Sequence, residues 1–466
     1  MSKKHLVVLG AGPGGYTAAF LAADRGMKVT LVDAQKSPGG VCLYKGCIPS
    51  KALLHVAGNI NESRSAKEWG VDFGDLTIDL DRLRRWKEGV VSKMSGGLAM
   101  LCKQRGVNYI HGCAVFKDSH TIMVSGRDTL EFDRCILATG SRPALPKHFR
   151  EGGPRIMDST AALTLTDIPQ RLLVVGGGYI GLEMGSVYAA LGSRVCVIEM
   201  TNELLPGVDR DLVRPLQGKL TKDFEAIHLS TLATSVVAEE NSVSVIMESG
   251  EETVEETFDR ILVSVGRRPN SDAIGLDNTK VELDEGGFVK VDEQQKTTDS
   301  SILGIGDVVG GPMLAHKASD EARVAVDGLT GEETRSLNRT IPAVVFTDPE
   351  IAWCGLTESD AGLKGEKVEI ARFPWGASGR AQTLGRTDGM SKLVLEAGTG
   401  CVLGVGIVGH GAGDLIAEGV LAIEMGATAK DLAHTIHPHP TLSETLMEAA
   451  EVFFGTATHV HKRSRK

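Results

Sequence analysis

Short runs of apolar residues alternate with longer stretches of helical pattern over roughly the first two thirds of the chain. The runs at 6–9 and 172–175 contain only Leu and Val, and each precedes a glycine-rich turn, a helical stretch and a second apolar run. Continuous apolar runs that alternate with helices are typical of parallel strands buried on both faces. The pattern therefore predicts an α/β fold with two Rossmann-like dinucleotide-binding domains, each built in three layers.

The pattern changes near residue 342, after which short strands separated by turn signals precede two helical stretches. This predicts a mixed α+β C-terminal domain with enough apolar surface for a dimer interface. Upstream, the similar stretches CILATGSRP at 135–143 and ILVSVGRRP at 261–269 would close the two nucleotide domains. The predicted domains are 1–146 and 147–269 for the two nucleotide sites, 270–342 for a central part completing the first site, and 343–466 for the interface domain.

The most informative feature is an internal repeat, in which residues 6–33 align with 172–199 without a gap, at an offset of 166. Each copy holds a G-x-G-x-x-G turn between a strand and a helix, with an acid 18 residues after the last glycine. Such glycines allow the tight turn, the approach of a pyrophosphate and close helix packing, while the acid accepts from a ribose hydroxyl. The two predicted dinucleotide sites comprise Gly10, Gly12, Gly15 and Asp33, and Gly176, Gly178, Gly181 and Glu199.

Composition narrows the possible functions of the 466-residue chain. The 50 basic and 60 acidic side chains give a formal charge of −10, which argues against a nucleic-acid partner. The sequence shows neither an apolar run as long as a membrane span nor a signal-peptide pattern at its start. Eight cysteines are too few for a disulfide-stapled secreted scaffold. We therefore expect a cytoplasmic protein without a membrane partner.

Cys42 and Cys47 differ from the scattered cysteines because they are five residues apart in GGVCLYKGCIPSK, at the start of a probable helix. Two unrelated buried thiols are as plausible as a redox pair when this segment is taken alone, and no second pair supports a metal site. Beside a nucleotide fold, the redox interpretation is favoured. A thiolate at a helix N-terminus is stabilised by the dipole, and Lys51 would add positive charge from the same helical face.

A second group of chemically capable residues lies in HTIHPHPTLSE at 434–444. Prolines interrupt any regular metal-ligand spacing, so we expect no metal here. A histidine in the Pro-flanked turn and the following Glu444 suit an orienting pair, in which the carboxylate fixes the ring tautomer; a capping role for one histidine is an equal alternative. Asp307, in a glycine-rich loop, could bind a polyol hydroxyl or simply cap a turn.

Taken together, the motifs GAGPGGY, GGVCLYKGCIPSK, LATGSRP, VVGGGYIGLEMGSVYAALGS, GIGDVVGGPMLAHKA and HPHPTLSE resemble the flavin-dependent pyridine nucleotide–disulfide oxidoreductases over nearly the whole length. The resemblance implies FAD and NAD as cofactors. Cys42 would exchange with substrate while Cys47 faces the flavin, and His439 would be the acid/base, oriented by Glu444. This pair would act on the disulfide of the other subunit in a homodimer.

The resemblance also assigns the cofactor sites residue by residue. Lys51 and Glu183 would pair beside the flavin. The first repeat would bind FAD together with Lys51, Ala114, Gly140, Asp307, Met313, Leu314, Ala315 and His316, and the second would bind NAD together with Val236 and Gly266.

Within this family, the sequence is most similar to enzymes that oxidise protein-bound dihydrolipoamide with NAD⁺. Its partner would then be a lipoyl-bearing acyltransferase or carrier protein of a multienzyme complex. NAD is favoured over NADP because Glu199 would repel a 2′-phosphate and no Arg or Lys follows it before Arg210. The alternatives are an NAD(P)H-dependent reductase of another small disulfide and, less favoured, a non-catalytic FAD scaffold.

The sequence departs from the family pattern at three places. Tyr44 and Lys45 stand between the two cysteines, where they could alter the potential or the access of the disulfide. Asp33 replaces a usual Glu, and either acid can reach a ribose. Tyr179 stands where an aliphatic residue is usual, and we hypothesise that its ring covers the nicotinamide pocket until NAD binds.

Overall fold

The computed structural model describes residues 4–125, 129–150, 153–332 and 340–461. Its first domain is a five-stranded parallel sheet with the strand order β18-β7-β1-β2-β3. Alternate residues of the central strand enter two different cores, with Leu6 and Val8 on one face and Val7 and Leu9 on the other. The strands are β1 (His5–Leu9), β2 (Lys28–Asp33), β3 (Asn108–His111), β7 (Arg134–Leu137) and β18 (Ile302–Gly304).

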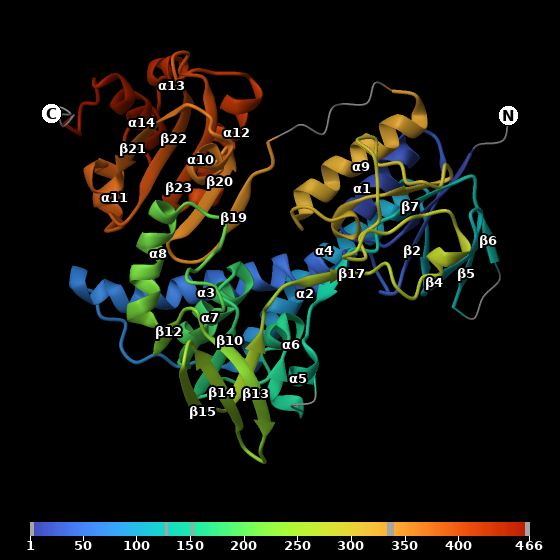
Figure 1. Ribbon diagram of the computed structural model, residues 1–466, viewed down its shortest axis with the longest axis horizontal. Helices are drawn as coiled ribbons and strands as arrows, with labels where there is room; N and C mark the ends of the chain where they lie inside the picture. Colours follow the sequence, from blue (N-terminus) through green and yellow to red (C-terminus); the bar gives the residue numbers. More distant parts are fainter. Residues whose placement is uncertain (1–3, 126–128, 151–152, 333–339, 462–466) are drawn as a thin grey trace.

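Helices cover one face of this sheet and a small antiparallel sheet covers the other (Figure 1). On the helical face, α1 (Pro13–Asp24) packs against α9 (Ala315–Thr330), which comes from the far end of the domain in sequence. The opposite face packs on β4 (Ala114–Asp118), β5 (Thr121–Val124) and β6 (Thr129–Glu131). The three-layer arrangement is therefore as predicted.

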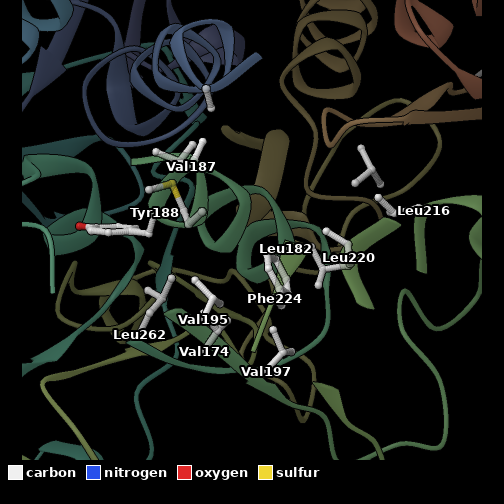
Figure 2. Packing of buried hydrophobic residues seen from close by; sticks show 14 of the residues in the cluster. Val174, Leu182, Val187, Tyr188, Val195, Val197, Leu216, Leu220, Phe224 and Leu262 are labelled. Atoms are coloured by element: carbon white, nitrogen blue, oxygen red, sulfur yellow. The ribbon is translucent and has the colours of Figure 1, made fainter. Parts of the chain in front are cut away.

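The second domain repeats this plan in the sheet order β12-β11-β10-β16-β9, again parallel. The repeat extends to strand register, because His5 pairs with Lys28 and Arg171 pairs with Arg194, each at the offset of 166. Figure 2 shows buried side chains of the core around this sheet, among them Val195 of a strand and Leu182 and Val187 of a helix. The strands of the parallel sheet are β9 (Ile156–Met157), β10 (Arg171–Val175), β11 (Arg194–Ile198), β12 (Ala226–His228) and β16 (Arg260–Val263), and its helices are α7 (Tyr179–Leu191) and α8 (Arg210–Asp223). A second, antiparallel sheet packs on the opposite face of the parallel sheet and comprises β13 (Leu232–Ala238), β14 (Val243–Ser249) and β15 (Glu252–Phe258).

The stretches 135–143 and 261–269 do not close the two sheets at an edge. Strands β7 and β16 each have one further neighbour, β18 and β9, because a buried strand gains from pairing on both sides. After each strand the chain continues into one arm of a two-stranded ribbon, β8 (Ser141–Pro143) with β17 (Arg267–Pro269), which links the two domains. The domain boundaries at 146, 269 and 342 stay predictions.

Three helices between β2 and β3 bridge the two nucleotide domains. They are α2 (Gly40–Lys45), α3 (Cys47–Ser65) and α4 (Leu80–Gln104). The buried face of α3, with Leu53 and Ala57, joins the core of the second domain and packs on α7. The cysteine segment is thus held by both domains at once.

The C-terminal domain is an antiparallel sheet of order β19-β20-β23-β22-β21 covered by helices, at the opposite end of the molecule from the first sheet (Figure 1). None of the helices in the described ranges is long and apolar enough to cross a membrane. The strands are β19 (Ala343–Val345), β20 (Glu350–Gly355), β21 (Val368–Pro374), β22 (Met390–Glu396) and β23 (Val402–Gly409). The helices of this domain are α10 (Glu358–Lys364), α11 (Gly379–Leu384), α12 (Ala412–Glu424), α13 (Ala429–His434) and α14 (Glu444–Phe454). Two short helices earlier in the chain, α5 (Lys147–Arg150) and α6 (Ser159–Thr164), belong to the second domain.

Candidate active site

A cavity of about 540 Å³ lies where the first sheet, the cysteine helices and α7 meet. Its walls come from segments far apart in sequence, since the carboxyl ends of parallel strands and the first glycine turn converge there. Twelve of the residues predicted for the active site or for FAD line it: Gly10, Gly12, Asp33, Cys42, Cys47, Lys51, Ala114, Gly140, Glu183, Asp307, Met313 and Ala315. Leu314 and His316 lie outside the lining, and the His316 ring instead contacts the Pro342 carbonyl at 2.7 Å.

The first glycine turn has the shape that a dinucleotide requires. Gly10 has a φ of +98°, and a Cβ there would lie 2.1 Å from the Ala138 carbonyl oxygen. Gly15 lies under the turn, where a Cβ would be 1.8 Å from the Gly10 carbonyl oxygen. Gly12 lies against Gly40 and leaves the space over the N-terminus of α1 open. These residues fit FAD, whose pyrophosphate would lie over the amides at that helix end.

The Asp33 carboxylate closes the turn from the end of β2. It accepts from the backbone N–H of Ala11 at 2.6 Å and from that of Gln35 at 2.7 Å. The side chain also lines the cavity, so its remaining acceptor capacity is available to a ribose. The shorter acid therefore reaches the position that the repeat predicts.

Cys42 and Cys47 meet at the junction of α2 and α3, as the redox interpretation requires. Both are free thiols, and their side chains are within hydrogen-bond contact. The hydrogen bond from Cys42 and the charge of Lys51 outweigh burial and lower the pKa of Cys47 to about 7, whereas contact with Cys47 and burial raise the pKa of Cys42. Cys47 is also the first residue of α3, where the helix dipole favours an anion. These effects favour the thiolate at Cys47 over the thiolate at Cys42.

Lys51 is fixed by contacts with two other parts of the chain. Its Nζ lies 2.7 Å from an oxygen of Glu183 on α7 and 4.5 Å from the centre of the Phe346 ring. The other Glu183 oxygen accepts from the Phe346 backbone N–H at 3.0 Å. The predicted pair is present, and it places a compensated positive charge beside Cys47.

Sequence reasoning missed the network that positions Asp307. Its carboxylate accepts from Ser141 Oγ at 2.5 Å, and Arg267 donates to that same Oγ at 2.7 Å. Both new residues line the cavity and lie on the paired strands β8 and β17. The similarity of GSRP and GRRP was a signal that these two turns face one another.

The turn before Asp307 is fixed by a buried ion pair that sequence reasoning also missed. Lys317 Nζ lies 2.5 Å from one Glu321 oxygen, and the other oxygen accepts from the Gly306 N–H at 2.7 Å. Burial raises the pKa of Glu321 although Lys317 opposes it. The spacing of Lys317 and Glu321 on one helical face was visible in the sequence, but their burial was not.

The second glycine turn has the same backbone and different surroundings. Gly176 has a φ of +109°, and a Cβ at Gly181 would lie 2.2 Å from the Gly176 carbonyl oxygen. The Glu199 carboxylate is buried and accepts from Gly177 at 2.7 Å and from Thr201 at 2.8 Å. This turn lies outside the cavity, as do all the residues predicted for NAD: Gly176, Gly178, Gly181, Glu199, Val236 and Gly266.

Tyr179, the first residue of α7, lies between the second turn and the cavity. Its ring lines the cavity near Arg267, Glu183 and Asp307, and burial raises its pKa. This position is compatible with a ring that covers the nicotinamide pocket, and that role stays a prediction.

The predicted acid/base pair forms within the chain, away from the cavity. His439 Nδ1 lies 2.9 Å from Glu444 Oε1, and the other Glu444 oxygen accepts from the Thr441 N–H at 2.6 Å. Burial is outweighed by these bonds and by the charge of His437, so the pKa of Glu444 is lowered. The His439 side chain is 73% exposed and does not line the cysteine cavity of its own chain. A site shared between two subunits would account for this separation.

Three carboxylates, Asp209, Asp211 and Glu358, come close enough together to hold a cation. Lys392 Nζ already occupies the centre of this group, at 2.6, 2.7 and 3.5 Å from the three. Its side chain is only 1% exposed. The cluster therefore stabilises the contact between α8 and the C-terminal domain.

Comparison with known proteins agrees with this geometry. Residues 4–322 match the pyridine nucleotide-disulphide oxidoreductase family, and residues 341–450 match the dimerisation domain of that family. This chain belongs to the pyridine nucleotide-disulphide oxidoreductases. The predicted fold class, the oxidoreductase chemistry and the cofactors FAD and NAD(H) are thereby confirmed, and the C-terminal domain supports a homodimer.

Relatives cover the chain from end to end. Dihydrolipoyl dehydrogenase of Haemophilus influenzae is 45% identical over 468 residues, covering 100% of this chain and 98% of that protein. The enzyme of the same name from Geobacillus stearothermophilus is 43% identical over 457 residues, covering 97% of each. Among solved structures, LpdA of Mycobacterium tuberculosis aligns with a TM-score of 0.89 at 28% identity, covering 97% of this chain and 99% of that one. The flavoprotein disulfide reductase RclA of Escherichia coli aligns with a TM-score of 0.85 at 28% identity, covering 95% and 98%.

Proposed function

We propose that this protein oxidises dihydrolipoamide carried on a partner protein to lipoamide, and reduces NAD⁺ to NADH. The observation that carries the proposal is the position of Cys42 and Cys47, with Lys51 beside them, in the same cavity as the first glycine turn. A thiolate held beside a flavin site suits disulfide exchange coupled to two-electron transfer. The full-length similarity to dihydrolipoyl dehydrogenases selects the dithiol.

The first half-reaction is a thiol–disulfide exchange that starts from the oxidised Cys42–Cys47 pair. His439 Nε2 accepts a proton from one thiol of the substrate, while Glu444 holds the ring through Nδ1. The substrate thiolate attacks Cys42 Sγ, the Cys42–Cys47 bond breaks, and Cys47 leaves as the thiolate that Lys51 stabilises. The second substrate thiol then attacks the substrate sulfur of the mixed disulfide, and its proton passes to the departing Cys42 sulfur, so that lipoamide closes and Cys42 is released as a thiol.

The second half-reaction returns the cysteine pair to its disulfide. The turn of Gly10 and Gly12 would hold the FAD pyrophosphate, Asp33 its adenosine ribose, and Asp307 a polyol hydroxyl. The bound flavin supplies two-electron chemistry between a thiolate and a nicotinamide. The second turn, with Glu199, would hold NAD⁺ and disfavour a 2′-phosphate.

A homodimer would complete the site, since His439 and Glu444 of one subunit would serve the cysteines of the other. The lipoyl group must arrive on a separate acyltransferase or carrier protein of a multienzyme complex. We place this reaction in the cytoplasm, which the sparse cysteines favour.

The test is an anaerobic titration of the purified flavoprotein with dihydrolipoamide, followed by addition of NAD⁺ or NADP⁺. We expect a long-wavelength thiolate–flavin absorption on reduction, then NADH formation with little NADPH. A flavin that stays oxidised would contradict the assignment of dihydrolipoamide as the substrate. The substrate would then be another small disulfide, and NADH-dependent reduction of a panel of small disulfides would identify it.

A further inference from the structure

The segment that carries His439 has few means of holding its position. It runs from the end of α13 at His434 to the start of α14 at Glu444, and its Ile436 side chain is 96% exposed. The contact between His439 and Glu444 orients the ring and joins the middle of the segment to the start of α14. An anchor to another helix would fix the segment further, because small displacements of a general base cost much of its efficiency.

His437 supplies such an anchor. Its side chain is 6% exposed, and Nε2 lies 2.7 Å from Oε1 of Glu418 on α12. Nδ1 lies 2.9 Å from the Thr435 carbonyl oxygen. The ring therefore connects the segment to a helix of the C-terminal domain at one nitrogen and to its own backbone at the other.

Both partners of His437 are acceptors, namely a backbone carbonyl and a carboxylate. A neutral imidazole has one N–H and satisfies only one of them, whereas an imidazolium donates to both. The two distances together show a ring held between two acceptors on different parts of the domain.

The charge of His437 reaches the acid/base pair. The Thr441 N–H and His439 are the larger causes that outweigh burial and hold the pKa of Glu444 below its usual range, and the charge of His437 adds the smallest contribution. An ionised Glu444 is what accepts from His439 Nδ1 and keeps Nε2 free for a substrate proton.

We propose that His437 and Glu418 are positioning residues for the acid/base step, an inference that rests on the proposed function. The His437 ring, held between Glu418 and the Thr435 carbonyl, fixes the segment of residues 435–443 and with it the position of His439. The pair lies outside the set of residues that would touch substrate or cofactor, and it acts through His439.

The test compares three variants of the full-length holoenzyme with a matched control. His437→Leu removes both contacts, His437→Gln keeps a donor toward Glu418, and Glu418→Gln keeps the shape but removes the charge. The control is His459→Gln, because His459 forms a pair with Glu448 in the same domain at 2.5 Å without reaching His439. For each protein, kcat/KM for dihydrolipoamide is measured against pH, alongside NADH oxidation by an artificial one-electron acceptor, which bypasses the thiols.

We expect His437→Leu to lower kcat/KM for dihydrolipoamide roughly ten- to hundred-fold and to change its pH profile. His437→Gln should recover part of the loss, and the control should match the parent protein. NADH oxidation by the artificial acceptor should stay within about two-fold throughout, which shows that the variants fold and hold both nucleotides. Parental kcat/KM and pH profile in His437→Leu would overturn the proposal.

A second measurement separates this inference from the proposed function. The backbone amides of residues 435–443 should exchange with solvent faster in His437→Leu than in the parent protein and in His459→Gln. If the parent protein fails to oxidise dihydrolipoamide, the proposed function fails, while amide exchange still tests the anchor. Parental exchange rates in His437→Leu would refute the anchor even if the enzyme is fully active.

Discussion

The two glycine turns share their sequence pattern, strand register and backbone, but they face different neighbours. Gly12 of the first turn lies against Gly40 of the cysteine segment, and together they border the large cavity. At the second turn, a Cβ on Gly177 would meet Leu204 at 2.7 Å, and the acid at the strand end is buried. The same motif is thus inserted into two environments.

The difference arises from the segment after the second strand of each repeat. After β2 the chain enters the helices that carry Cys42 and Cys47, whereas after β11 it forms a loop that leads to α8. A dinucleotide motif supplies phosphate binding in both places. Which cofactor meets the thiols is decided by the segment beyond the motif, which supports FAD at the first turn and NAD at the second.

The largest effect is expected from removing the chemistry beside the first turn. Cys47→Ser replaces the stabilised thiolate by a hydroxyl, so dihydrolipoamide oxidation should fall by a factor on the order of 10³ or more. NADH oxidation by an artificial acceptor should continue, because it needs both turns but not the thiols. Cys113→Ser, an exposed cysteine of the same cavity, is the matched control and should stay near parental rates. Substantial lipoamide turnover in Cys47→Ser would contradict the assigned pair.

A methyl group in the first turn should cost the protein its flavin. Among the residues that the structure describes, a Cβ at Gly12 would meet only Gly40 Cα at 3.9 Å, so Gly12→Ala is compatible with the fold but fills the approach to the helix amides. We expect FAD affinity to fall by about ten-fold or more, measured by reconstitution of the apoprotein. Gly58→Ala, at an open position on α3, is the control. Unchanged FAD affinity in Gly12→Ala would show that the pyrophosphate lies elsewhere.

The matching change in the second turn should affect NAD alone. A Cβ at Gly178 has no neighbour within 4 Å among the described residues, so Gly178→Ala should fold and keep its flavin. We expect KM for NAD⁺ to rise by roughly three- to ten-fold, with dihydrolipoamide reduction of the flavin unchanged. Loss of FAD from this variant, or an unaltered KM for NAD⁺, would contradict the assignment of FAD to the first turn and NAD to the second.

The features that the sequence predicted best depend on residues that lie close together in the chain. The repeat of residues 6–33 and 172–199, with its strands and acids, needs only local pattern, and the structure reproduces it down to register. The pair of His439 and Glu444 is five residues apart and was equally accessible.

The missed features depend on contacts across the fold. Ser141 and Arg267 meet because two distant strands pair, and Glu321 reaches Gly306 only once α9 packs on the first sheet. Leu314 and His316 were assigned with a continuous segment of which only Met313 and Ala315 line the cavity, and the role of the other two stays a prediction. Sequence spacing identifies a segment more readily than the side of it that faces the ligand.

The smallest expected effect concerns Lys51, whose positive charge helps to lower the pKa of Cys47. The pKa of Cys47 is lowered to about 7 by the Cys42 hydrogen bond and by Lys51, so in the reduced enzyme its thiolate persists above this pH and is protonated below it. The thiolate–flavin absorption should therefore decline as the pH falls through about 7. Lys51→Gln removes one favourable charge, so the midpoint should move to higher pH and the absorption at pH 7 should weaken. Lys93→Gln, which removes an exposed charge on α4 away from the cavity lining, is the control and should leave the midpoint in place. A midpoint that is the same in Lys51→Gln would mean that the Cys42 hydrogen bond and the helix N-terminus suffice, and that the ion pair with Glu183 serves mainly to hold α3 against α7.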